Sequence, residues 1–283
     1  MRTAASALAL LVAVSACANP GAGVPETPST AASPTETASP SPSVFAEAVD
    51  IGEGRSLYLV CRGEGSPVVL FEAGDTDGAF SWERVMDEVA EHTRACAYDR
   101  AGIGGSSEAM GCRRLPELIG DLEALIEAAT IPAPYVLVAA SGGGFIASTF
   151  ARLHPEDVAG MVFVDVPRAF QDAPPELIED IRCDNPNNIE RRDFLHVEHD
   201  AWDSRAEVGD IPVTIMSVDH GENARDLEEQ INVEAQQGWL VLSPRAEQLV
   251  VTHTGHGIHY EDPAFVANEV IEVLEAARSD LSD

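Results

Sequence analysis

Residues 135–144 read YVLVAASGGG, a short apolar run followed by a serine and three glycines. Such a run predicts a buried strand, and the small residues after it predict a sharp turn into a helix. A serine on that turn needs very small neighbours two positions away on each side, because the backbone is strained and the helix packs closely. Ala139 and Gly143 meet that need. The pattern therefore predicts an exposed hydroxyl at Ser141, with the amide of Gly142 directed toward a developing oxyanion.

Strands and helices alternate on both sides of this turn. Apolar runs predict strands at 56–60, 68–72, 94–98, 135–138, 161–165, 212–218 and 248–252. Apolar residues at helical spacing predict helices between them, for example at 80–92 and 115–129. This alternation predicts an α/β domain with a mostly parallel sheet and helices on both faces.

The alternation fails between residues 167 and 210, a stretch rich in Asp, Glu, Pro and Asn. An insertion of this length between two strands is usually a cap over a site, so we predict a cap insertion at 167–210 after the sixth strand. A mobile surface loop is the alternative.

The first 43 residues differ from the rest. Arg2 precedes a short apolar run, too short to span a bilayer, and the small residues before Cys17 resemble the lipobox of bacterial lipoproteins. The resemblance implies a signal peptide at 1–17, lipidation of Cys17 and a location on the outer face of a membrane. An ordinary secretory signal is the alternative, and both export the chain. Residues 18–43 are rich in Pro, Ser and Thr and predict a disordered tether, which leaves 44–283 as the folded domain.

Charge excludes several functions. The chain has 48 acidic residues against 17 basic ones, all arginine, for a net charge of −31. Such an acidic chain is not expected to bind nucleic acid, whose phosphates favour the opposite charge. The lack of lysine excludes Schiff-base lysines, Walker-type phosphate sites and Ser-Lys dyads.

Four cysteines lie in the domain: Cys61, Cys96, Cys112 and Cys183. Export exposes them to an oxidising compartment, and an even number favours disulfides. Of three possible connectivities we favour Cys61–Cys96 and Cys112–Cys183. The first two lie on strands predicted to be neighbours, and the last two lie in irregular segments near the predicted site. Four buried thiols are the alternative.

From about residue 50 onward the chain resembles the α/β-hydrolases. Residues 139–143 resemble their nucleophile elbow, with Ala139 where glycine is usual. Residues 71–75, FEAGD, resemble the turn that supplies the second oxyanion donor, which implies this role for the backbone amide of Asp75. Residues 98–104, YDRAGIG, resemble the loop after the fourth strand. The resemblance implies an α/β-hydrolase fold.

The residues after the last predicted strand, 254–259, read TGHGIH and resemble the loop that delivers the family's catalytic histidine. A serine hydroxyl is a poor nucleophile until a base takes its proton, so His256 is the predicted base. A metal site is also conceivable here, because three histidines follow one another at a spacing of three residues: His253, His256 and His259. We expect them at a strand end and in a loop, however, and not on one face of a helix. We therefore predict neither a metal nor a cofactor.

A catalytic histidine takes the serine proton on one ring nitrogen, and the N–H of its second ring nitrogen must donate to an acidic side chain. Most α/β-hydrolases place it after the seventh strand, where this chain has Asp219, but at a displaced position. Some relatives, including certain haloalkane dehalogenases, place it at the end of the sixth strand, where this chain has Asp165. We favour Asp165 and keep Asp219 as the alternative.

The order Ser, Asp, His implies acyl transfer through a serine ester. The leading hypothesis is a carboxylic-ester hydrolase for a small neutral or cationic ester, without an obligate protein partner. The alternatives are an acyltransferase or cofactor-free perhydrolase with the same triad, and a non-catalytic envelope binding protein.

Overall fold

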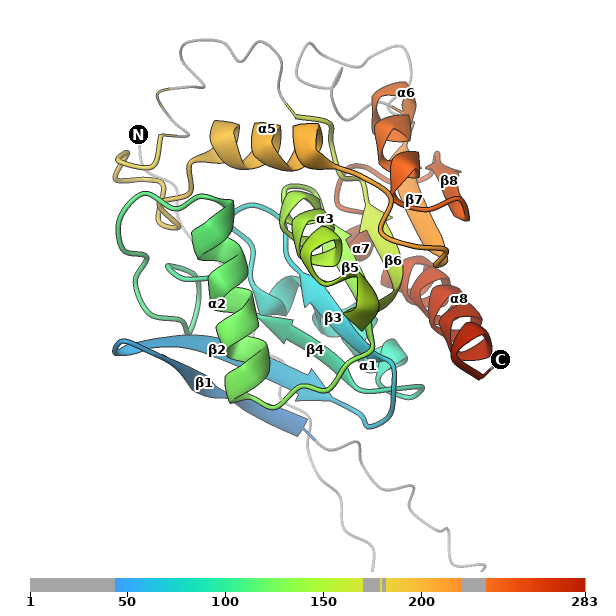
Figure 1. Ribbon diagram of the computed structural model, residues 1–283, viewed down its shortest axis with the longest axis horizontal. Helices are drawn as coiled ribbons and strands as arrows, with labels where there is room; N and C mark the ends of the chain where they lie inside the picture. Colours follow the sequence, from blue (N-terminus) through green and yellow to red (C-terminus); the bar gives the residue numbers. More distant parts are fainter. Residues whose placement is uncertain (1–43, 170–178, 180–181, 220–232, 283) are drawn as a thin grey trace, which may run out of the picture. The chain divides into compact units, whose positions relative to one another are not determined.

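The computed structural model describes residues 44–169, 179, 182–219 and 233–282 (Figure 1). The predicted signal peptide, the lipidated cysteine and the tether lie outside these ranges, as do residues 170–178 and 180–181 of the predicted insertion. The described residues all belong to one compact unit that begins at Ser41.

The described residues contain eight strands. They are Val44–Gly52 (β1), Arg55–Arg62 (β2), Val68–Glu72 (β3), Ala95–Tyr98 (β4), Tyr135–Ala140 (β5), Val158–Val164 (β6), Val213–Val218 (β7) and Ala246–Val251 (β8). They form one sheet in the order β1-β2-β4-β3-β5-β6-β7-β8. The pairs β1–β2 and β2–β4 are antiparallel, and all others are parallel. Every residue of β3 to β7 is buried, which explains their continuous apolar runs.

Helices cover both faces of the sheet (Figure 1). The longer ones are Glu83–Val89 (α1), Leu115–Ala128 (α2), Gly143–Leu153 (α3), Phe194–Ser204 (α5) and Pro263–Ser282 (α8). Short ones are Val233–Gln236 (α6) and Ile258–Glu261 (α7), with 3-10 turns at Ala79–Trp82 (η1), Pro155–Asp157 (η2) and Gln237–Leu242 (η5).

Two apolar clusters hold these layers together. On β3, Val68 and Leu70 join the cluster that contains buried residues of α2, α3 and α5, whereas Val69 and Phe71 join the cluster of α1 and α8. Successive side chains of a strand point to opposite faces, so each strand contributes to both clusters. The predicted mostly parallel sheet with helices on both faces is confirmed.

Both disulfides join the pairs that the sequence favoured. Cys61 and Cys96 face each other in the register of β2 and β4 and are bonded. The Cys112–Cys183 bond ties the loop before α2 to the insertion after β6. Next to this bond, Arg113 and Arg192 form a short parallel bridge, in which Arg113 donates its N–H to the carbonyl of Arg191 at 2.8 Å.

The described part of the insertion carries α5, which packs on α3 through buried Val197 and Ala201. Within the described ranges, no helix combines the length and the apolar character needed to cross a bilayer.

Candidate active site

Ser141 occupies the turn between β5 and α3, and its backbone is strained. Its φ is 47°, in the left-handed region that residues other than glycine rarely adopt. Its N–H donates to the carbonyl of Val164 on β6 at 3.0 Å, which fixes the turn to the sheet. A Cβ on Gly143 would collide with the backbone carbonyl of Ala73, so the helix approaches β3 as closely as the sequence predicted. The serine is thus held at the carboxyl end of the central strands.

His256 lies in the loop between β8 and α7 and contacts Ser141 and Asp165. Its Nε2 is 2.9 Å from Oγ of Ser141, and its Nδ1 is 2.7 Å from Oδ2 of Asp165. The hydrogen bond to Asp165 is the largest influence on the pKa of His256 and raises it above 6.5, with smaller contributions from Asp75 and Asp77, although burial opposes them. The structure therefore brings three of the predicted residues into one connected arrangement.

Asp165 is completely buried at the end of β6, and both of its oxygens accept hydrogen bonds. Oδ1 accepts from the N–H of Val218 at 2.9 Å and from Nε2 of Gln236 at 2.7 Å, which leaves Oδ2 for His256. Asp219, the other acid considered, follows β7, and its N–H donates to the carbonyl of Val251 at 2.8 Å. Of the two acids, it is Asp165 that contacts Nδ1 of His256.

Gln236 is a residue of this arrangement that sequence reasoning missed. Its Oε1 accepts from Ser217 at 2.8 Å, and Ser217 in turn accepts from Nε2 of Gln248 at 2.8 Å. These side chains extend the hydrogen-bond chain behind Asp165 by two further elements, β7 and β8. Gln236 lies 71 positions from Asp165 and belongs to no motif, so no local signal indicates it.

The loop after β3 runs beside the serine. A Cβ on Gly74 would lie 3.4 Å from Cβ of Ser141. In the part of the chain that the structure describes, the N–H groups of Asp75 and Gly142 have no protein acceptor. Two free backbone donors next to a serine hydroxyl are what an oxyanion hole requires.

Charged side chains are buried behind this loop. Arg100 donates from Nε to Glu190 at 2.7 Å and from Nη1 to Glu72 at 2.7 Å, and Tyr98 donates to Glu72 at 2.5 Å. Burial raises the pKa of Glu72. Burial also acts to raise the pKa of Glu190, but Arg100, Arg192 and the N–H of Thr76 together outweigh it and lower that pKa. Buried Arg192 forms an ion pair with the carboxylate of Asp75. The sequence did not indicate these pairs, because Glu190 and Arg192 lie in the insertion.

The other two histidines of the loop region have different surroundings. His253 is 3.2 Å from Asp262. His259 is buried against Trp82, with ring centroids 4.6 Å apart, and burial lowers its pKa to about 4. Within the described ranges, the one cluster with the spacing of metal ligands is Cys112, Cys183 and Asp193, and its two sulfurs form the disulfide.

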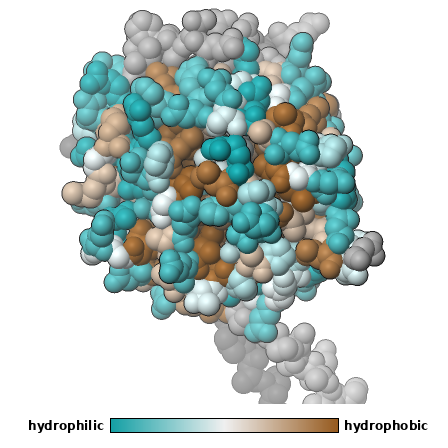
Figure 2. Space-filling model, viewed as in Figure 1, coloured by the Kyte–Doolittle hydropathy of each residue, from teal (hydrophilic) through white to brown (hydrophobic). Residues whose placement is uncertain are grey.

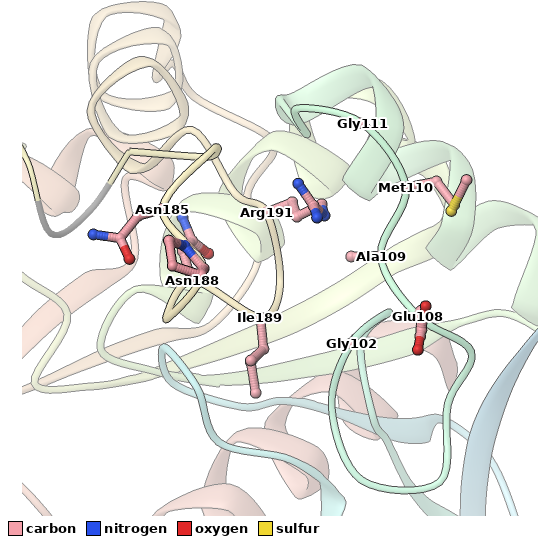
Figure 3. Close-up of a pocket in the computed structure, with 10 residues that line it drawn as sticks. Gly102, Glu108, Ala109, Met110, Gly111, Asn185, Asn188, Ile189 and Arg191 are labelled. Carbon is pink, nitrogen blue, oxygen red and sulfur yellow. The ribbon is translucent and has the colours of Figure 1, made fainter.

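A cavity of about 510 Å³ lies between residues 102–111 and 185–191 (Figure 3). Ile189 and Arg191 line one wall, and Met110 lines the other. None of Ser141, His256 and Asp165 lines it, so it is separate from the candidate active site.

Comparison with known proteins agrees with this architecture. Residues 67–182 match the model of a family described as the alpha/beta hydrolase fold. Among curated proteins, Uncharacterized protein YqjL of Bacillus subtilis (strain 168) is 25% identical over 227 residues, 76% of this chain and 87% of that protein. Matches to further curated proteins span between 18% and 42% of those proteins.

Solved structures show the same fold. A thermophilic esterase from Thermogutta terrifontis has a TM-score of 0.65 at 18% identity, over 83% of this chain and 99% of that one. The epoxide hydrolase VrEH1 from Vigna radiata has a TM-score of 0.62 at 17% identity, over 83% of this chain and 98% of that one. The chain therefore has the α/β-hydrolase fold, as the sequence predicted. Because this fold supports many chemistries, the function has to be argued from the site.

Proposed function

We propose that this protein is a serine hydrolase that cleaves carboxylic esters through an acyl-serine intermediate. One observation carries the proposal: Oγ of Ser141, the imidazole of His256 and the buried carboxylate of Asp165 form one hydrogen-bonded chain, at 2.9 Å and 2.7 Å. A serine joined to a base that an acid orients is the arrangement that activates a hydroxyl for attack on a carbonyl.

The reaction proceeds in two balanced steps. Oγ of Ser141 attacks the ester carbonyl while Nε2 of His256 takes the hydroxyl proton, and Asp165 stabilises the resulting imidazolium. The backbone amides of Asp75 and Gly142 hold the oxyanion. The C–O bond then breaks, and the alcohol leaves with the proton from His256. Water next attacks the acyl-serine with His256 as base, which releases the acid and regenerates Ser141.

The nucleophile separates this proposal from the other chemistries of the fold. Epoxide hydrolases and haloalkane dehalogenases occur among the similar proteins. Enzymes of those two classes with this fold use an aspartate as nucleophile, whereas this chain has Ser141 at the elbow. A serine favours acyl transfer, with water as the acceptor for a hydrolase.

A fluorophosphonate probe and a set of chromogenic esters of increasing acyl length test the proposal. The full chain should hydrolyse at least one ester and form one probe adduct on Ser141, and Ser141→Ala should lose both. Ser204→Ala, an exposed serine on α5, is the matched control. If the full chain gives neither adduct nor hydrolysis, the proposal is wrong and the binding-protein alternative gains support. If added alcohol or peroxide takes the acyl group in preference to water, the enzyme is a transferase or perhydrolase.

We also propose that the chain is exported and anchored through a lipid on Cys17. The support is the resemblance of residues 1–17 to a lipoprotein signal and the tether-like composition of 18–43. In a bacterial host, labelled fatty acid should be incorporated by the full chain but not by Cys17→Ala. Equal labelling of both would contradict the proposal.

A further inference from the structure

Arg192 is fully buried, and its guanidinium binds the two residues whose amides form the proposed oxyanion hole. Nη1 donates to the carboxylate of Asp75, and Nη2 donates to the carbonyl of Gly142 at 2.9 Å. Asp75 follows β3 and Gly142 follows β5, whereas Arg192 comes from the insertion after β6. One side chain from outside the central strands thus connects the two loops that flank Ser141.

The position of the Asp75 carboxylate makes this contact important. A Cβ on Gly142 would collide with that carboxylate, so the carboxylate packs directly against the residue after the nucleophile. A negative charge there would oppose the oxyanion that forms during attack. The cation of Arg192 neutralises the carboxylate while leaving the amide of Asp75 free.

A second pair from the same segment fixes the rest of the loop. Glu190 accepts a hydrogen bond from the N–H of Thr76 at 2.8 Å and binds Arg100. Arg100 donates to the carbonyls of Ala73 at 2.7 Å and Gly74 at 2.6 Å. The loop from Ala73 to Thr76 is therefore held on both sides of Asp75.

The segment that supplies these groups faces two ways. Glu190 and Arg192 are buried against the loop, whereas Ile189 and Arg191 are exposed and line the separate cavity in Figure 3. The N–H of Asp193 donates to the carbonyl of Arg113 at 2.8 Å, and the Cys112–Cys183 bond anchors the chain nearby. Burying the charge of an arginine without a partner is strongly destabilising. The ion pair with Asp75 therefore stabilises Arg192 in its buried position, and the anchors on both sides of the segment keep Arg192 within reach of Asp75.

We propose that Arg192 is a positioning residue for the reaction, because it holds the loops of Asp75 and Gly142 in register and cancels the charge of the Asp75 carboxylate. This inference rests on the proposed ester hydrolysis, in which those two loops supply the oxyanion donors. Arg192 acts through them and does not touch the reacting atoms.

The variant Arg192→Gln tests the proposal, with Arg191→Gln as the matched control from the exposed face of the same segment. Loss or displacement of an oxyanion donor lowers kcat by about 100-fold or more. We therefore expect kcat of Arg192→Gln for a short-chain p-nitrophenyl ester to fall about 100-fold while KM changes by less than about threefold. Affinity for a trifluoromethyl ketone, whose adduct carries an oxyanion, should fall in parallel with kcat/KM. Arg191→Gln should match the parent protein in all three measurements.

Two further variants separate positioning from general instability. Asp75 is one of the groups that raise the pKa of His256. In Arg192→Gln the Asp75 carboxylate loses its cation, so its negative charge should raise that pKa further. The rise of kcat/KM with pH should therefore shift to higher pH. Adding Asp75→Asn should reverse that shift and restore part of kcat. Arg192→Lys keeps the charge but not the two-pronged geometry, and an intermediate kcat is expected. If Arg192→Gln does not fold, Arg192→Lys provides the test of the positioning role.

The outcomes are distinct. If Arg192→Gln or Arg192→Lys is folded, as its near-ultraviolet circular dichroism would show, and has parental kcat and inhibitor affinity, the positioning role is wrong although ester hydrolysis stands. Equal loss of kcat and of substrate affinity without a pH shift would indicate general disruption and would also overturn it. If the parent protein hydrolyses no ester and forms no adduct on Ser141, the proposed function fails instead.

Discussion

Asp165 is the residue whose proposed role departs from the usual placement of the acid. It is buried at the end of β6, with a φ of 49°, and contacts Nδ1 of His256. Loss of this acid's charge should leave His256 in the wrong tautomer. We expect Asp165→Asn to lower kcat by about 10⁴-fold and Asp219→Asn to change it by less than about tenfold. Measuring kcat for an ester with both variants shows which acid orients His256. A larger loss in Asp219→Asn than in Asp165→Asn would assign that role to Asp219.

Gln236 should contribute less than Asp165, because it only orients the acid. Gln236→Leu removes one of the donors to Oδ1 of Asp165 that the described residues supply, and the N–H of Val218 remains. Loss of a partner that orients a functional group typically costs about 10- to 100-fold, so we expect kcat to fall by about tenfold. Gln237→Leu, at the neighbouring exposed position, is the control. Equal activity of both variants would show that the acid is oriented without Gln236.

His259 should make the protein sensitive to acid. Its pKa in the folded state is about 4, below the value of about 6.5 expected for an unfolded chain. The unfolded state therefore binds more protons between these values, and stability is lost as pH falls from about 6.5 to 4, by up to about 3 kcal/mol.

Urea unfolding from pH 7 to pH 4 tests this prediction. His259→Gln should lose less stability over that interval than the parent protein, whereas His92→Gln, at an exposed position, should follow the parent. An unchanged pH dependence in His259→Gln would show that other groups cause the acid sensitivity.

The residues differ in how readily sequence predicts them. Ser141 and His256 lie in short motifs, so local patterns were sufficient to single them out. Asp165 has no motif beyond its place at a strand end, and two acids therefore stayed open. Gln236 and Arg192 could not be found, because their partners lie 71 and 117 positions away and only the folded sheet brings them together.

Two helical glycines should respond oppositely to alanine. On α2, a Cβ at Gly120 would meet no atom within 4 Å, so Gly120→Ala should stabilise the protein by about 0.5–1 kcal/mol. At the start of α3, a Cβ at Gly143 would collide with the carbonyl of Ala73, so Gly143→Ala should destabilise it by about 1–3 kcal/mol. Urea unfolding measures both. A neutral Gly143→Ala with full activity would show that α3 need not approach β3 so closely.

At the scale of elements, the fully buried strands β3 to β7 were all predicted, whereas β1 was not. β1 is mostly exposed, and a strand without a buried face leaves little apolar pattern to recognise. The helix predicted at 80–92 is divided into the 3-10 turn Ala79–Trp82 and α1, which ends at Val89. Apolar spacing predicts that a helix forms, but it does not resolve such a division.

The charge of the whole domain should bias its choice of substrate. Residues 1–43 contain two of the 48 acids and one of the 17 arginines, which leaves a net charge of −30 on the domain. Polar side chains are prominent on the face shown in Figure 2. Such a field attracts cations at low salt and is screened as salt rises.

Two isosteric esters test this bias, namely a choline ester and the matching neutral 3,3-dimethylbutyl ester. The ratio of their kcat/KM values should favour the cation at 10 mM salt and fall by at least about threefold at 0.5 M. A ratio independent of salt would show that local contacts set the preference.

The two-sided segment of residues 189–192 also has a practical consequence. Randomising positions 189 and 191 would reshape the cavity wall while sparing the loops beside Ser141. Randomising 190 and 192 would sacrifice the buried ion pairs. A designed library that alternates conserved and variable codons along these four positions should therefore retain far more active clones than one that varies all four.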